Sequence, residues 1–134
     1  EYTRKGKQQL FALTLAENFN PAAVERFYQR QNPVELINYG GNIVRANSKN
    51  SGFTNKFTVI DWLDIFEGNF VSEVFEGKIV ILGYMGSDLS DTSWDDKLYT
   101  PLNMEYAGRT NPDMYGVVVH ANILSMILNG TFID

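Results

Sequence analysis

The sequence predicts an α/β domain in which helices flank a small, mostly parallel sheet. Three observations predict this class: apolar residues recur at helical spacing near both ends, a β-branched run lies between glycines, and a helical pattern separates that run from an earlier strand pattern. Strand, helix and strand in this order predict a right-handed βαβ crossover. With 134 residues, the chain is expected to form a single domain over residues 1–134.

The N-terminal part predicts two helices in succession. The first covers residues 11–18, where aromatic and aliphatic side chains recur every four positions. Asn20 is a good N-cap residue, and Pro21 is tolerated at the first position of the second helix. Asn32 and Pro33 are expected to end this helical region.

The middle of the chain predicts strands followed by a third helix. Residues Val34–Tyr39 have strand composition, and a short strand is expected at Asn42–Ala46 beside a polar loop. Thr58 and Asp61 have the spacing of a capping box, which predicts a helix start. Gly68 is expected to end that helix.

The C-terminal half predicts a buried strand, a long loop and a final helix. The run "GKIVILGY", residues 77–84, is typical of a strand that is buried on both faces. Residues 85–115 show no clear periodicity, and a loop of this length is usually functional or partly disordered. The final helix is predicted over Met114–Asn129, with Asn111 and Pro112 as a cap pair and Gly130 as its stop.

Charge and composition exclude several classes of protein. The net charge is −5 and the eleven basic residues are scattered, which argues against a nucleic-acid partner. No apolar stretch has the roughly 18 to 20 residues that a membrane span needs. The chain has no cysteine, so disulfides, thiolate metal sites and cysteine nucleophiles are excluded within it.

The long loop concentrates the negative charge. Between residues 88 and 113 there are six acidic residues against two basic ones. Asp88, Asp91, Asp95 and Asp96 alternate with hydroxyl side chains and are candidate ligands of a divalent cation such as Ca²⁺ or Mg²⁺. Their spacing is not that of an EF-hand, so a solvated loop rich in turn residues is the favoured interpretation.

Two glycines, Gly83 and Gly86, follow the predicted buried strand. They resemble a phosphate-binding turn only loosely, because the Lys-Ser/Thr ending of a P-loop and the three-glycine dinucleotide spacing are both missing. We interpret them as residues that let the backbone turn at the end of the strand.

His120 is the only histidine of the chain and lies within the predicted final helix. One hypothesis makes it a general base oriented by Asp91, with a nucleophile drawn from Ser90, Thr92, Ser93 or Thr100. The favoured hypothesis is structural: a buried imidazole donates a hydrogen bond that fastens the acidic loop to the helix. Asn122 follows two residues later and is therefore expected on another side of that helix.

Several motifs together resemble the type-two CHASE domain, a sensory module of bacterial membrane receptors. They are "FEGKIVILG" (75–83), an aspartate soon after it, Thr-Pro, and "GVVVHANILSMILNG" (116–130); upstream, "VELINYGG" is similar to the family's strand before the crossover. The resemblance covers roughly residues 34–133. The residues that match its motifs are Asp91, Thr100, Pro101, Gly116, His120, Ala121 and Asn122.

The resemblance implies a non-enzymatic sensory domain on the extracytoplasmic, periplasmic side of a bacterial inner membrane. Transmembrane helices of the parent protein would flank it, and its partner would be an unknown small ligand or protein. It also implies that an N-terminal part of the domain precedes residue 1, and an exposed sheet edge would then favour a homodimer. No catalytic residue and no cofactor is implied beyond the candidate divalent cation.

Two other functions stay open at this point. The first is a metal-assisted hydrolase that uses the loop Asp88–Asp96 together with His120. The second is a structural assembly module without a ligand.

Overall fold

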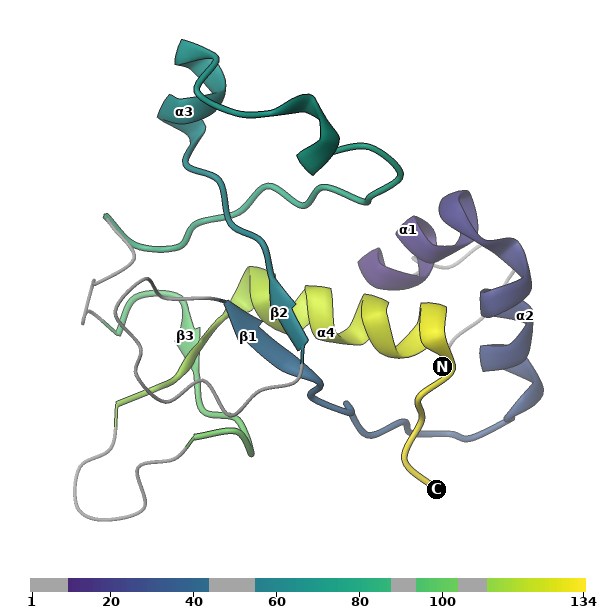
Figure 1. The fold of residues 1–134 in the computed structure, drawn as a ribbon. Helices are drawn as coiled ribbons and strands as arrows, with labels where there is room; N and C mark the ends of the chain where they lie inside the picture. Colours follow the sequence, from purple (N-terminus) through teal and green to yellow (C-terminus); the bar gives the residue numbers. More distant parts are fainter. Residues whose placement is uncertain (1–9, 44–54, 88–93, 104–110) are drawn as a thin grey trace.

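The computed structural model describes residues 10–43, 55–87, 94–103 and 111–134. This part of the chain has a mixed α/β fold, which confirms the predicted class (Figure 1). Its elements, in chain order, are α1 (Phe11–Phe19), α2 (Pro21–Gln29), β1 (Gly41–Ile43), β2 (Asn55–Phe57), α3 (Trp62–Glu67), a 3₁₀ turn η1 (Ser72–Val74), β3 (Lys97–Leu98), β4 (Met114–Tyr115) and α4 (Gly116–Asn129).

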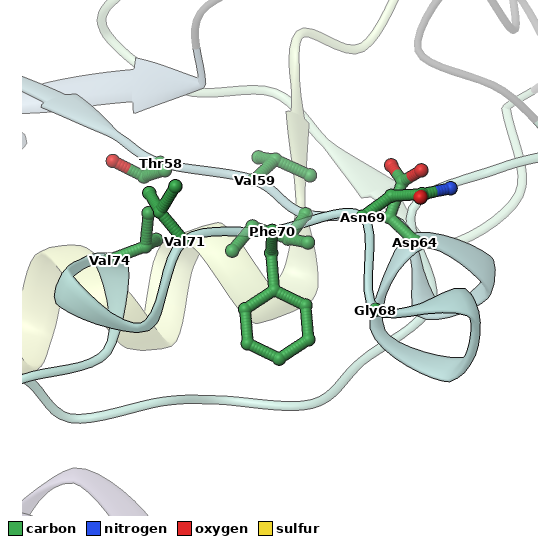
Figure 2. A pocket seen from close by; sticks show the side chains of 9 residues that line it. Thr58, Val59, Asp64, Gly68, Asn69, Phe70, Val71 and Val74 are labelled. Atoms are coloured by element: carbon green, nitrogen blue, oxygen red, sulfur yellow. The ribbon is translucent and has the colours of Figure 1, made fainter.

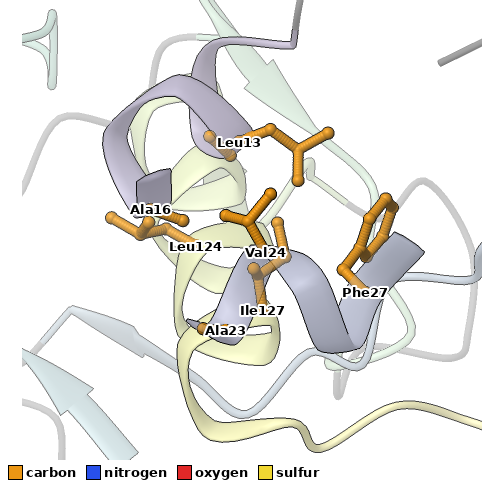
Figure 3. Close-up of a cluster of buried hydrophobic side chains, with 8 residues drawn as sticks. Leu13, Ala16, Ala23, Val24, Phe27, Leu124 and Ile127 are labelled. Carbon is orange, nitrogen blue, oxygen red and sulfur yellow. The ribbon is translucent and has the colours of Figure 1, made fainter. Parts of the chain in front are cut away.

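Helix α4 forms the centre of the fold. Helices α1 and α2 pack against its C-terminal half, and the two small sheets lie toward its N-terminal end (Figure 1). Figure 3 shows the apolar cluster between the three helices, in which Leu13, Val24 and Ile127 are fully buried. Burying each of these side chains contributes about 1.5–3 kcal/mol. This cluster holds α1 and α2 on α4.

A second apolar cluster lies around the start of α4. Met114, Tyr115, Val118 and Val119 are buried there, and half-buried side chains from the 37–43 and 57 regions pack against them. Helix α4 therefore buries side chains against helices on one side and against the strands on another. This explains why apolar residues lie on most faces of α4.

The first two predicted helices are confirmed. Asn20 separates α1 from α2 as expected, but it caps α2 only through its backbone, where the N–H of Ala23 donates to its carbonyl at 3.0 Å. The capping box predicted for the third helix is wrong, because Asp61 is itself the N-cap and accepts from the N–H of Leu63 at 2.8 Å. Gly68 ends α3 with φ of 74°, as predicted.

The predicted single, mostly parallel sheet is wrong for the described residues. They contain two separate two-stranded sheets, a parallel pair β1 and β2 and an antiparallel pair β3 and β4. The parallel pair precedes α3 in the chain, so α3 does not connect the two strands of a βαβ crossover. Strand pairs of two or three residues carry too little periodicity to be recognised in a sequence.

The predicted strand Val34–Tyr39 is not regular in the structure. Val34 and Leu36 are exposed, whereas Ile37 and Tyr39 pack against the second cluster. The side chains therefore alternate as they do in a strand, but side chains of α4 contact the backbone hydrogen-bonding groups of this region. The N–H of Asn38 lies 3.4 Å from the sulfur of Met126, for example.

The segment 77–84 is also irregular, and the prediction that both its faces are buried is wrong. Ile79 and Ile81 pack against the helical cluster, but Val80 is 52% exposed and Leu82 is 85% exposed. The described elements cover only one side of this extended segment. A continuous apolar run predicted burial that the tertiary structure provides on one face alone.

The C-terminal part departs from expectation at the start of the last helix. Met114 and Tyr115 pair with β3 instead of opening the helix, so α4 begins at Gly116 and Pro112 lies before β4. The left-handed conformation of Gly130, with φ of 66°, confirms the predicted stop.

Candidate functional site

Asn122 joins the middle of α4 to Gly40 and Gly41 at the start of β1. It is 1% exposed, and its Oδ1 accepts hydrogen bonds from the N–H groups of Gly40 at 2.9 Å and Gly41 at 3.1 Å. Its Nδ2 donates to the carbonyls of Gly41 and Val118, both at 2.9 Å. Without Asn122, the buried N–H and carbonyl of Gly41 would lose these partners. Asn122 therefore fixes the start of β1 on the helix.

His120 lies on an exposed side of α4, so the prediction of a buried imidazole is wrong. Its ring packs edge-on against Phe11 of α1, with ring centroids 5.4 Å apart. The different placement of His120 and Asn122 on the helix is confirmed. Asp91 lies outside the described residues, so the bond between the imidazole and the acidic loop stays a prediction.

The acidic loop is described only in part. Asp88 and Asp91, like the candidate nucleophiles Ser90, Thr92 and Ser93, lie outside the described residues. Asp95 and Asp96 are exposed in the turn before β3. Within the described ranges, no group of three or more His, Cys, Asp or Glu side chains is placed to hold a metal ion. The cation site at this loop stays a prediction.

Asp96 meets the first residue of α4. The N–H of Gly116 donates to the carbonyl of Asp96 at 3.0 Å, and a Cβ at Gly116 would lie 3.3 Å from Oδ1 of the same aspartate. A carboxylate at this position interacts favourably with the partial positive charge of a helix N-terminus. Gly116 is thus a position of close approach between the loop and the helix.

Thr100 and Asp113 form a polar contact between the two sides of the β3–β4 ribbon. The N–H of Thr100 donates to Asp113 Oδ1 at 2.8 Å, and its hydroxyl donates to Oδ2 at 2.5 Å. The same hydroxyl accepts from the N–H of Leu102 at 3.2 Å, so it shapes the turn at Pro101, which is exposed. Within the described residues, the Thr100 hydroxyl therefore bonds only to groups that shape the local backbone.

Asp113 also acts on Tyr39. Burial, and then the negative charge of Asp113, raise the pKa of the Tyr39 hydroxyl above its ordinary value. In the sequence alone, Asp113 is only one of the acidic residues between positions 88 and 113. Its distance of thirteen residues from Thr100 offers no local pattern that would have indicated the contact.

The two glycines after residue 82 have different roles. Gly86 has φ of 87°, which confirms that it lets the backbone turn. Gly83 instead lies against α4, since a Cβ at this position would be 2.7 Å from Cβ of Val117. The absence of a side chain at Gly83 is what brings the 77–84 segment onto the helix.

Arg30, at the C-terminal end of α2, is the centre of a cluster that the sequence analysis missed. Its Nε lies 2.6 Å from Glu35 Oε1, and its Nη1 lies 3.0 Å from Asp134 Oδ1. Its guanidinium also stacks over the ring of Phe132, 4.6 Å from the centroid. The hydrogen bonds that Arg30 donates to Glu35 and then to Asp134 raise its pKa above the ordinary value. Asp134 lies 104 residues from Arg30 in the chain, so no local signal predicts this contact, whereas Glu35 is only five residues away.

The described residues also form an open hollow beside α3 (Figure 2). It has a volume of about 610 Å³ and lies between residues 58–60 and the α3–η1 segment. Val59, Phe70, Val71 and Val74 give it mostly apolar walls, and Asp64 and Asn69 lie at one end. None of the motif residues lines it.

Three of the motif residues therefore make contacts that are separate from one another. Thr100 binds Asp113, Asn122 binds the first residue of β1, Gly41, and Gly116 lies against Asp96. The described residues do not bring these side chains together into one catalytic array. Two of the contacts fasten other segments to α4, and the third joins the two sides of the β3–β4 pair.

Comparison with known families gives one match. The family model described as the CHASE2 domain matches residues 3–134. No curated protein and no solved structure matches the chain. Among the described helices, none combines the length and apolar character that crossing a membrane requires.

Proposed function

The chain belongs to the CHASE2 domain family, and from this premise we propose that it is the sensory input domain of a bacterial transmembrane receptor. CHASE2 domains are extracytoplasmic sensory domains, and the match over residues 3–134 is the observation that carries the proposal. The stimulus is a small ligand or a partner protein that meets the domain outside the cytoplasm.

The contacts of the motif residues support a role without catalysis. Asn122 and Thr100, the most buried polar residues described, use their side chains to hold backbone turns. Asp96 lies at the start of α4. A sensory domain needs such a scaffold, because a ligand shifts a conformational equilibrium only when it binds two defined conformations with different affinity.

Helix α4 is the element that can carry the signal. It contacts α1, α2, β1 and β4, so a displacement of any of these elements acts on it. Its C-terminal end leads directly into the residues held by Arg30. We propose that a stimulus alters the packing on α4 and that the chain following the helix transmits this change.

Cysteine labelling of the full-length protein in cells tests the proposed location. The present chain has no cysteine, and any others in the parent are replaced. Ala22→Cys lies at an exposed position of α2, while its neighbour Ala23→Cys is fully buried and serves as the matched control. A membrane-impermeant maleimide should label Ala22→Cys in intact spheroplasts and label Ala23→Cys only after unfolding. Labelling of Ala22→Cys only after lysis would refute the extracytoplasmic location.

The sensory role is tested through the output activity of the parent protein. Ile127→Asp places a charge in the cluster between α1, α2 and α4, where Ile127 is 1% exposed. We expect this variant to disrupt the domain and to change the basal output activity. An output identical to that of the wild type, at equal membrane abundance, would contradict the proposal.

A further inference from the structure

The residues that follow α4 are held by side chains of one continuous segment, residues 26–38. Three of these side chains donate hydrogen bonds to the end of α4 and to the residues after it. The bonds are Arg26 Nη2 to Leu128 O at 3.3 Å, Asn38 Nδ2 to Thr131 O at 2.8 Å, and Arg30 Nη2 to Ile133 O at 3.2 Å, beside the Arg30–Asp134 ion pair. The end of the chain is thereby tied to the α2 region.

The two carboxylate partners of Arg30 differ strongly in their exposure to solvent. The side chain of Glu35 is 6% exposed, and Asn32 supports it with a hydrogen bond of 3.1 Å to Oε1. Arg30 binds Glu35 through both Nε and Nη2. Because the side chains of Arg30 and Glu35 are only 20% and 6% exposed, breaking this pair leaves a poorly solvated charge and is unfavourable. The ion pair of Arg30 with Glu35 is therefore the more stable of its two ion pairs.

The contact with Asp134 has the opposite character. The side chain of Asp134 is 92% exposed, and a single bond of 3.0 Å joins it to Nη1 of Arg30. Exposed ion pairs contribute little free energy and are screened by salt. This half of the cluster can open while Arg30 stays on Glu35.

Phe132 marks the point about which the chain end can turn. Its ring lies under the guanidinium of Arg30 and 6.0 Å from the ring of Phe27, and it packs against the helical cluster. Release of Asp134 therefore leaves the residues beyond Phe132 held by Arg30 only through the Ile133 carbonyl, and it leaves the core unchanged.

We propose that Arg30 is a positioning residue. Its ion pair with Asp134, called the latch below, sets the direction in which the chain leaves the domain relative to α2. The inference rests on the proposed function, in which the chain after α4 carries the signal. Because the Asp134 contact is weak, a stimulus needs only a modest difference in affinity between the latched and released states to shift their populations.

Distance measurements on the full-length protein in membranes test the latch directly. Nitroxide labels at Ala22→Cys and Ile133→Cys report the position of the chain end relative to α2. We expect a single narrow distance distribution in this labelled parent and in its Asp134→Glu variant, which keeps the carboxylate. Asp134→Asn should broaden the distribution, and so should high salt in the labelled parent. The matched control is Glu76→Gln, an exposed acid outside the cluster, which should change nothing. An unchanged distribution in Asp134→Asn would overturn the latch.

Output activity separates failure of the latch from failure of the proposed function. Asp134→Asn should change the basal output by roughly two- to fivefold, the range expected for an exposed ion pair, and Asp134→Glu should restore it. If Ile127→Asp changes the output and Asp134→Asn does not, the latch is wrong and the sensory role stands. If neither variant changes the output, the proposed function itself is wrong.

Discussion

Asn122 and Gly41 exchange a pair of hydrogen bonds between α4 and the start of β1. The N–H of Gly41 donates to Asn122 Oδ1 at 3.1 Å, and Asn122 Nδ2 donates back to the Gly41 carbonyl at 2.9 Å. The amide side chain thus bonds to the backbone as a neighbouring strand would. Residues 34–40 do not form a regular strand, and this contact explains how they are nevertheless held in place.

Removal of this amide is expected to be strongly destabilising. Asn122→Ala leaves the N–H groups of Gly40 and Gly41 and the carbonyl of Gly41 without this partner. Each unsatisfied buried group costs about 1–3 kcal/mol, so we expect a loss of about 3 kcal/mol or more in the free energy of unfolding. In a thermal melt this corresponds to a midpoint lower by roughly 10 °C. Asn129→Ala, at an exposed position of the same helix, should stay within about 0.5 kcal/mol of the wild type. Equal effects of the two substitutions would contradict this role.

Gly83 is expected to tolerate no side chain. Gly83→Ala places a Cβ 2.7 Å from Cβ of Val117, and overpacking of this kind typically costs about 1–3 kcal/mol in urea unfolding. Gly83→Asn should cost at least as much.

Gly68 is the matched comparison, because its constraint is the backbone and its surroundings are open. Asn tolerates the left-handed region, so Gly68→Asn should be milder than Gly68→Ala. If Gly83→Asn were also milder than Gly83→Ala, the constraint at Gly83 would be conformational rather than steric.

Tyr115→Phe is expected to leave the protein as stable as the wild type or to stabilise it by up to about 1 kcal/mol. The residue is 2% exposed, and its buried hydroxyl has no hydrogen-bond partner among the residues that the structure describes. Removal of an unsatisfied buried group relieves its desolvation penalty. The ring contacts with Tyr84 and Lys97 are retained in Phe but lost in Tyr115→Leu, which should be clearly destabilising. A loss above about 1 kcal/mol in Tyr115→Phe would mean that the hydroxyl is bonded in solution.

Thr100→Val tests the contact with Asp113 at nearly constant volume. The substitution removes the hydroxyl that donates to Asp113 and accepts from Leu102, and we expect a loss of about 1–2 kcal/mol. Thr58→Val, at an exposed position, is the control and should change the stability by less than about 0.5 kcal/mol. Chemical denaturation of both variants decides between a structural contact and an incidental one.

The raised pKa of Tyr39 predicts a loss of stability in alkali. The folded state favours the neutral hydroxyl, so its contribution is complete below the unfolded pKa of about 10 and is lost as the pH rises through the higher folded pKa. Comparison of tyrosinate absorbance titrations of the wild type and Tyr39→Phe isolates this group. Asp113→Asn should move the titration of Tyr39 to lower pH, because it removes a negative charge. A titration unaffected by Asp113→Asn would show that burial alone is responsible.

The helices were largely predictable from the sequence, because their signals are local. Apolar spacing, Pro21 and the left-handed stops Gly68 and Gly130 act within a few residues, and the structure confirms the corresponding elements. The motifs also indicated the family, since they lie in order along the chain.

Only the tertiary structure decided how these elements meet. The exposed outer face of the 77–84 segment depends on which elements cover it, and the close approach of Gly83 to Val117 depends on the path of two distant segments. The pairing of Thr100 with Asp113 and the grip of Arg30 on the chain end join residues without a shared local pattern. Local propensity determined the helices and their ends, whereas long-range packing and hydrogen bonding determined the strands, the burial and the contacts of the candidate site.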